Sequence, residues 1–225
     1  MKNKRAFAKS PAVARSTRLT QIERRAQSEQ RIIDAAIDLI AQKGVVRVTL
    51  AETGEKAGYS RGLPAHLFKT KSKLICECAK RIVQLRAARV ASVEPDPGID
   101  ALFGIIRTWL KLVEENPDGT RSYYIFLGET YYAESAVLFP EVRDIVLEAD
   151  RSIRKRFVEC LRNAKQRREI RSDVQPEIMA RFIFALLRGI VSQWLTDPEC
   201  ESLRRLSDSF LKELRGRLLP VRKQS

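Results

Sequence analysis

One short segment of the chain combines five basic side chains with a proline near its middle: GYSRGLPAHLFKTKSKL, residues 58–74. The segment has no acidic residue, and its basic residues are Arg61, His66, Lys69, Lys71 and Lys73. Guanidinium and ammonium groups bind phosphate oxygens, and side chains near a helix N-terminus can also reach base edges in the major groove. The segment therefore predicts contact with a nucleic acid.

Sequence patterns for catalysis, cofactors and metals are missing. There is no GxGxxG, P-loop, GxSxG or HExxH pattern. The one histidine, His66, lies inside the basic segment, so a Ser-His-Asp or Cys-His arrangement is not expected. The four cysteines form no CxxC pair, and zinc-ligand spacing is absent. We expect no enzyme activity, no cofactor and no metal; an enzyme on a helical scaffold is the weakest alternative.

The positive charge is concentrated at one end of the chain. Residues 1–91 hold 20 Lys and Arg against 7 Asp and Glu, whereas residues 92–225 hold 22 against 21. A one-ended excess is typical of a polyanion-binding surface. Nucleic acid is favoured over a membrane surface, because no basic amphipathic helix with a Trp/Phe face is seen. We expect no transmembrane segment and no secretory signal, and hence a cytoplasmic protein.

The elements that would position the basic segment are two short helices joined by a turn. Thr49 is a predicted N-cap with Glu52 three residues later, which is a capping box, and Gly58 ends that helix. Ser60 is available to cap a second helix through Phe68; alternatively, that helix begins a residue or two later, with Pro64 in its first turn. Such a pair predicts a helix-turn-helix whose second helix enters the major groove. The alternative is a helical hairpin with a solvated basic face.

The rest of the chain also predicts helices, so we expect an all-α fold. Apolar stripes at helical spacing begin after Ser28, the predicted first N-cap, and no strand pattern of convincing length appears. Lys43-Gly44 is expected to end the first helix, and residues 45–48 to pack onto the core. Further helices are expected over 72–85, 99–115, 140–166, 176–195 and 203–218, with an aromatic segment at 120–138.

Three parts follow from this pattern. Residues 1–25 are expected to form a disordered basic arm, residues 26–71 the DNA-binding domain and residues 72–225 a larger helical domain, with a breaker at 94–98. The arm has three interpretations: a solvated tail, a segment that touches DNA, or an organellar transit peptide.

The run from 32 to 75 resembles the N-terminal DNA-binding domain of the TetR (tetracycline-repressor-like) transcriptional regulators. The matching motifs are Lys43-Gly44, Thr49, Ala57-Gly58-Tyr59-Ser60, Phe68 and Lys71. The resemblance implies DNA contacts by Thr49, Tyr59, Ser60, Arg61, Leu63, His66 and Lys71. Departures from the family pattern are Thr53-Gly54 in the second helix and Pro64-Ala65 in the third; the family's backbone contact cannot be assigned to Ala65.

In family terms the C-terminal part is a ligand-binding and dimerisation domain. The last two apolar helices can pair with a second copy as a four-helix bundle, or can serve only the intramolecular core. Five aromatic residues are candidates for a ligand pocket, although core packing explains them equally well: Trp109, Tyr123, Phe126, Tyr131 and Trp194.

These observations predict a ligand-responsive, homodimeric transcriptional regulator. We expect a repressor that leaves a palindromic double-stranded operator when an unidentified small molecule binds its C-terminal domain. The alternative is a sequence-independent basic DNA-binding protein, for which the charge of residues 1–91 would suffice.

Overall fold

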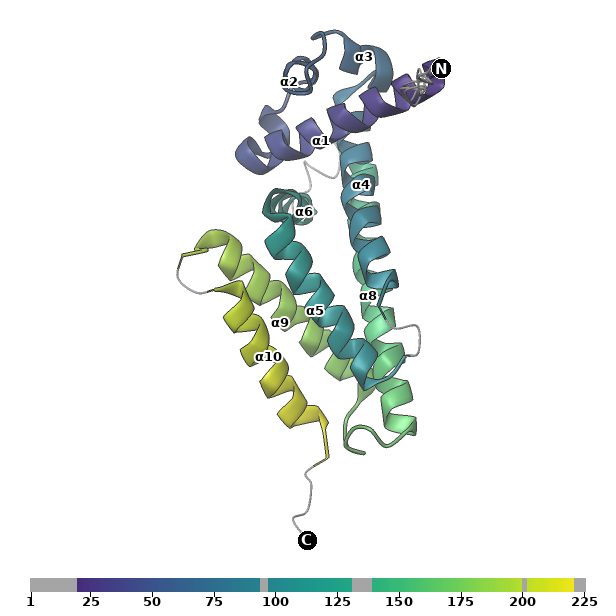
Figure 1. Cartoon of the computed structure of the whole chain (residues 1–225), viewed down its shortest axis with the longest axis vertical. Helices are drawn as coiled ribbons and strands as arrows, with labels where there is room; N and C mark the ends of the chain where they lie inside the picture. The colour runs from purple at the N-terminus through teal and green to yellow at the C-terminus, as the bar shows by residue number, and fades with distance from the viewer. Residues whose placement is uncertain (1–19, 94–96, 131–138, 200–201, 221–225) are drawn as a thin grey trace, which may run out of the picture.

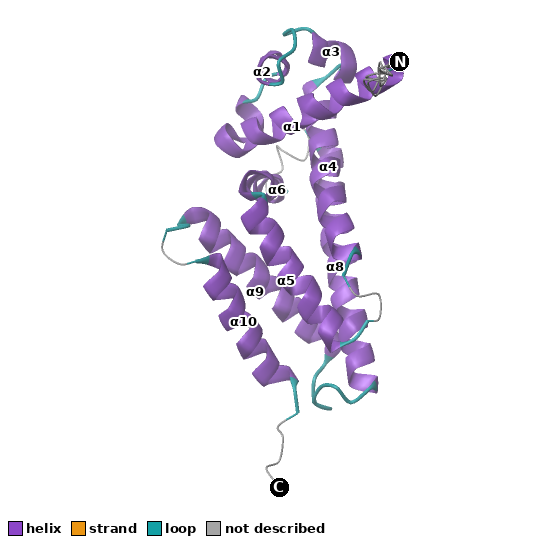
Figure 2. Ribbon diagram, viewed as in Figure 1, coloured by secondary structure: helices purple, strands orange, loops and turns teal. Residues whose placement is uncertain are grey.

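A computed structural model of the protein describes residues 20–93, 97–130, 139–199 and 202–220. Within these ranges the chain is helical with no strand, so the all-α prediction is confirmed (Figure 2). The helices are α1 (Gln21–Arg47), α2 (Leu50–Lys56), α3 (Leu63–Phe68), α4 (Lys71–Ala91), α5 (Ile99–Glu115), α6 (Pro117–Glu129), α8 (Pro140–Gln166), α9 (Pro176–Thr196) and α10 (Leu203–Leu218).

The molecule is elongated, with the first three helices at one end (Figure 1). We call α1, α2 and α3 the N-terminal head. Helix α4 runs from the head along the length of the molecule and packs against α1, α5, α6 and α8. Helix α6 lies across the end of the bundle and contacts α1. Two helices, α4 and α6, therefore connect the head to the rest of the chain.

An apolar core crosses the predicted domain boundary at 71/72. The buried cluster of the head includes Ile32, Ile40 and Phe68, and it continues into Phe126 of α6 and Val146 of α8. Ser122 of α6 adds a buried hydrogen bond from its Oγ to the main-chain oxygen of Ile37, at 2.7 Å. A second cluster is built from α5, α8, α9 and α10. The head is thus packed firmly on α6.

The start of α1 differs from the prediction. Thr20 is the N-cap, and it forms a capping box with Glu23, so the helix begins at Gln21. Ser28 lies inside the helix, where its Oγ donates to the Arg24 carbonyl at 2.9 Å. The prediction of Ser28 as N-cap was wrong, and residues 21–25 are helical instead of part of a disordered arm. The polar first turns carry no apolar stripe, but the Thr-x-x-Glu signature satisfies their free N–H groups.

The end of α1 agrees with the prediction in its main features. Gly44 has a φ of 78° and interrupts the helical backbone, although helical geometry resumes briefly to Arg47. Val45 and Val48 are buried in the core of the head, as expected for the connection at 45–48.

Helix α9 is more apolar than the sequence analysis allowed. By length and composition alone it could span a membrane, and 28% of its apolar window is buried. The expectation that no segment is long and apolar enough was therefore wrong for α9. One face of the helix packs in the core, while Ile178, Phe182 and Leu186 on the opposite face are exposed at spacings of four residues. This exposed stripe accounts for the additional hydropathy.

Candidate nucleic-acid interface and internal cavity

Helix α2 is fixed at its N-terminus by the predicted capping box. Thr49 Oγ1 accepts from the Glu52 N–H at 3.3 Å, and the Thr49 N–H donates to Glu52 Oε2 at 3.1 Å. Lys43 Nζ lies 2.6 Å from Glu52 Oε1, which ties α1 to α2. The hydrogen bonds from Lys43 and then Thr49 lower the pKa of Glu52 to about 2. Thr49 is exposed, but its hydroxyl already serves the cap.

The turn between α2 and α3 depends on a glycine and a proline that lie against each other. A Cβ at Gly54 would lie 2.6 Å from the Ser60 carbonyl oxygen and 3.0 Å from Pro64 Cδ. The Tyr59 N–H donates to the Gly54 carbonyl at 2.8 Å, and Gly58 has a φ of 79°. Only a residue without a side chain fits at position 54.

Helix α3 begins later than a Ser60 cap would require. Its N-cap is Gly62, with no side-chain cap, and the Ser60 carbonyl accepts from the Leu63 N–H at 3.2 Å. Pro64 is in the first turn, where its missing N–H removes no helical bond. Of the two predicted starts, the later one is correct, and Ser60 is not the N-cap.

The predicted DNA-contacting residues fall into two groups. Thr49, Ser60, Arg61 and His66 are exposed. The Arg61 side chain is 72% exposed, and its ion pair with Glu55 is loose, at 3.4 Å. The others are half-buried: Tyr59 and Leu63 pack against the core of the head, and Lys71 Nζ donates to the Val46 carbonyl at 2.6 Å.

The bundle contains a cavity of about 790 Å³ between α4, α5, α6 and α8. Its lining includes two of the predicted aromatic residues, Trp109 and Tyr123. The remaining wall is made of apolar, hydroxyl-bearing and charged side chains: Val83, Arg86, Ala87, Arg89, Val90, Ala91, Thr108, Leu112, Ile145, Glu148, Ala149, Asp150, Ser152, Ile153 and Arg156. The volume lies in the range of small-molecule sites.

Arg86 lies close to both aromatic rings on the cavity wall. Its guanidinium carbon is 4.9 Å from the centroid of the Trp109 ring and 4.6 Å from that of Tyr123, which are cation–π distances. Loss of hydration lowers the pKa of Arg86, and the neighbouring Tyr123 and Asp150 oppose that shift. Arginine stays charged all the same.

Asp150 binds the polar groups next to Arg86. It is 3% exposed; Tyr123 Oη donates to its Oδ1 at 2.7 Å, and Arg188 lies 3.0 Å from its Oδ2. Burial, followed by the charge of Asp150, raises the pKa of Tyr123, so the phenol stays protonated as the donor. We call Arg86, Tyr123, Asp150 and Arg188 the charged cluster. It contains two guanidinium groups and one carboxylate.

Sequence analysis missed Arg86 and Asp150, although each leaves a signal. Both occupy positions in an apolar stripe: Val83, Arg86 and Val90 on α4, and Val146, Asp150 and Ile153 on α8. A charged residue at a core-facing helical position is unusual unless it has a partner or a function.

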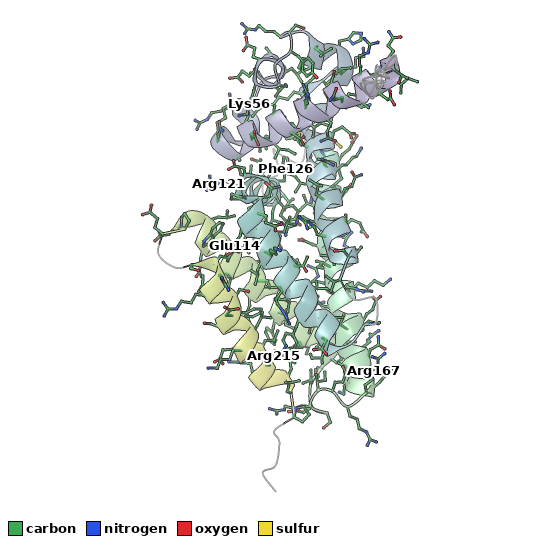
Figure 3. The ribbon with its side chains drawn as sticks, viewed as in Figure 1. Lys56, Glu114, Arg121, Phe126, Arg167 and Arg215 are labelled. Atoms are coloured by element: carbon green, nitrogen blue, oxygen red, sulfur yellow. The ribbon has the colours of Figure 1, made fainter. Side chains whose placement is uncertain are left out.

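The other predicted aromatic residues lie elsewhere. Phe126 is in the core where α6 meets α1 (Figure 3), and Trp194 is half-buried against the core of the C-terminal helices. Neither lines the cavity. Tyr131 falls outside the described residues. Within the described ranges, no three His, Cys, Asp or Glu side chains are grouped to hold a metal ion.

Comparison with known proteins identifies the family. Residues 32–78 match the model of bacterial regulatory proteins of the tetR family, and residues 126–210 match the tetracyclin repressor-like C-terminal domain. The chain belongs to the TetR family. Its match to the N-terminal model covers α2, α3 and the start of α4, so the DNA-binding helix-turn-helix of TetR regulators is present here.

A curated relative extends the match over most of the chain. The HTH-type transcriptional regulator TtgR of Pseudomonas putida is 26% identical over 191 residues, which are 85% of this chain and 89% of TtgR. This TetR-family chain is therefore a DNA-binding transcriptional regulator, like its relatives.

Two solved structures share the fold. A transcriptional regulator from Saccharomonospora viridis, solved with choline, has a TM-score of 0.75 at 19% identity and covers 87% of this chain and 99% of its own. The SmeT–triclosan complex has a TM-score of 0.69 at 22% identity, and the match covers 87% of this chain and 93% of SmeT.

Proposed function

We propose that the protein is a homodimeric repressor that binds a palindromic operator and releases it when a small molecule fills the cavity. The observation that carries this proposal is that the cavity is lined by α4 and α6, the two helices that connect the head to the bundle. A ligand that prefers one arrangement of these helices shifts the spacing of two heads in a dimer. The protein acts in the cytoplasm by binding, without catalysis.

Neighbouring residues of α6 give this coupling a physical basis. Tyr123 lines the cavity, and Ser122 donates to the Ile37 carbonyl of α1 at 2.7 Å. Successive residues of a helix point about 100° apart, so one turn of α6 faces both partners. Any movement of α6 that repositions Tyr123 therefore also displaces Ser122 and, through its hydrogen bond to Ile37, helix α1 of the head.

Helix α4 offers a second connection. Arg86 lines the cavity, while Lys71 at the other end of the same helix donates to the Val46 carbonyl of α1. A rigid helix of 21 residues carries a displacement at one end to the other.

The exposed face of α9 supports dimerisation. Ile178, Phe182 and Leu186 form an apolar stripe in contact with water in the single chain, next to α10. Two such faces related by a two-fold axis bury each other in a four-helix bundle. The symmetric dimer would present two heads to the two halves of a palindrome.

We propose Thr49, Ser60, Arg61 and His66 as the primary DNA contacts, with Tyr59, Leu63 and Lys71 acting mainly by positioning. Arg61 is the best candidate for reading bases, because it directly precedes α3, is 72% exposed and is only loosely paired. A bidentate arginine–guanine contact discriminates by about 1–3 kcal/mol.

The test is fluorescence anisotropy with a palindrome from the protein's own promoter region, competed with random DNA at physiological salt. We expect Arg61→Ala to weaken operator binding by about 5- to 150-fold and to affect random DNA much less. Arg107→Ala, at an exposed position on α5, is the matched control and should leave both affinities unchanged. Equal competition by random DNA for the unmodified protein would instead favour sequence-independent binding.

A further inference from the structure

We propose that the effector is an amphipathic anion, with an apolar or aromatic body and one acidic group that pairs with Arg86. The inference rests on the proposed function for its regulatory meaning, but the charge preference of the cavity can be tested without DNA. It is carried by the placement of charged side chains around the cavity.

The acidic side chains at the cavity are already engaged, whereas two cations are not. The ion pairs at or near the wall are Arg89–Glu115 at 3.0 Å, Arg151–Glu148 at 3.6 Å and Arg188–Asp150 at 3.0 Å. Arg86 and Arg156 also line the wall, and neither forms an ion pair or a side-chain hydrogen bond within the described part of the chain. Within the described residues, Arg86 and Arg156 are therefore cations of the cavity wall without an ion-pair partner.

The position of Arg86 shows what kind of group could pair with it. Its guanidinium lies within cation–π distance of the Trp109 and Tyr123 rings, but cation–π contacts give its N–H groups no hydrogen-bond acceptor. Arg86 is half-buried in the cavity wall, and a partly desolvated guanidinium without an ion-pair partner is costly. A carboxylate, sulfonate or phosphate in the cavity would accept two parallel N–H bonds from it.

The same geometry disfavours a cationic ligand. Facing aromatic rings bind quaternary ammonium groups through their π-electrons. In this chain the pair Trp109 and Tyr123 already holds a cation of its own, Arg86. A second positive charge would meet repulsion from Arg86 and Arg156 at low dielectric.

The remaining wall selects the body of the ligand. Val83, Val90, Leu112, Ile145 and Ile153 line the cavity with aliphatic surface. With about 790 Å³ available, the cavity has room for one or two fused rings or a medium-length alkyl chain beside the acidic group.

The experiment measures binding of a matched set of probes to the full-length protein by isothermal titration calorimetry. The probes are naphthaleneacetate, its primary amide and naphthylmethyl-trimethylammonium, together with the same three head groups on phenyl and decyl bodies. We expect the best-fitting anion to bind at least about tenfold more tightly than its amide, and the cation to bind most weakly.

Substitutions assign the preference to Arg86. Arg86→Met should remove the advantage of the anion over the amide, while Arg86→Lys should keep part of it, since lysine retains the charge but not the planar fork. Arg107→Met is the matched control and should keep the full advantage. The ligand-free Arg86→Met protein should melt at about the same temperature as the unmodified protein, because within the described residues Arg86 forms no ion pair or side-chain hydrogen bond that the substitution would break, and methionine keeps the apolar part of the side chain.

Several results would overturn the proposal. The binding results that would do so are equal affinity for the three head groups, no binding of any probe up to about 1 mM, or an advantage of the anion that persists in Arg86→Met. A clear fall in the melting temperature of Arg86→Met would also do so, because Arg86 would then have a structural role. Failure of the proposed function looks different: the anion binds through Arg86 but leaves the operator complex intact. Operator release by a neutral compound, equal in the unmodified protein and Arg86→Met, would keep the repressor and reject the anion.

Discussion

The N-terminal head and the cavity handle charge in opposite ways. In the head, the half-buried Lys43 and Glu52 pair with each other, and the cations left over face water. Around the cavity most charges are paired, and the cations left without an ion pair within the described residues are Arg156 and the half-buried Arg86, which lies beside the Trp109 and Tyr123 rings. The unpaired cations of the head are exposed to water, whereas these two unpaired cations of the bundle line its cavity.

This difference shows how much each kind of charge reveals about its ligand. Exposed cations cost little, and together they attract any polyanion over a distance set by salt. They indicate a nucleic acid but not its sequence. A half-buried guanidinium without an ion-pair partner is costlier than an exposed one, so its retention indicates one particular chemistry in the partner.

Removing the only carboxylate of the charged cluster should have the largest effect. Asp150→Ala would leave Arg188 and Arg86 without a nearby negative charge, and we expect a loss of about 3–5 kcal/mol in the free energy of unfolding. Urea denaturation measures it. Glu148→Ala, which changes an exposed residue of the same helix that also lines the cavity, should change stability by less than about 0.5 kcal/mol. Similar values for the two variants would show that the cluster is not a buried network.

The close approach in the head should be next in size. Gly54→Ala introduces a Cβ against the Ser60 carbonyl and the Pro64 ring, and we expect about 1–3 kcal/mol of destabilisation. Operator affinity should fall with it, since α3 must move. The control is Gly62→Ala, where the added Cβ meets nothing within 4 Å and φ is −84°; thermal unfolding should show it neutral or stabilised. A stable Gly54→Ala protein would mean that the turn is looser than described.

The smallest effects should separate two lysines at the start of α4. Lys71→Ala and the exposed Lys73→Ala should each reduce the slope of log affinity against log salt by about one if each contacts phosphate. Lys71→Ala should also cost about 0.5–1.5 kcal/mol of stability, because the Val46 carbonyl loses its donor. If only stability changes at position 71, then Lys71 anchors α4 to α1 and Lys73 is the phosphate contact.

Most of the helices could be predicted from the sequence, because their apolar stripes, caps and breakers are local. The capping box at Thr49 and the starts of α5, α8 and α9 follow from a few adjacent residues. The start of α1 was misplaced because the capping signature at Thr20 precedes the apolar stripe by more than two turns.

The cavity could be predicted only in part. Tyr123 and Phe126 are both aromatic residues of α6, yet one faces the cavity and the other the core; neighbours distant in sequence decide which. The charged cluster draws on four helices, so no local pattern brings Arg86, Asp150 and Arg188 together. The interruptions of two apolar stripes were the available clue.

The hydrogen bond from Ser122 to Ile37 ends on a main-chain oxygen. Every amino acid offers that same oxygen whatever its side chain, so replacing residue 37 does not disconnect α6 from the head. Mutations on the outer surface of α2 and α3 can accordingly change which operator is chosen, and mutations of the cavity wall can change which molecule is sensed. The hydrogen bond that connects α6 to the head would be preserved during both kinds of sequence change.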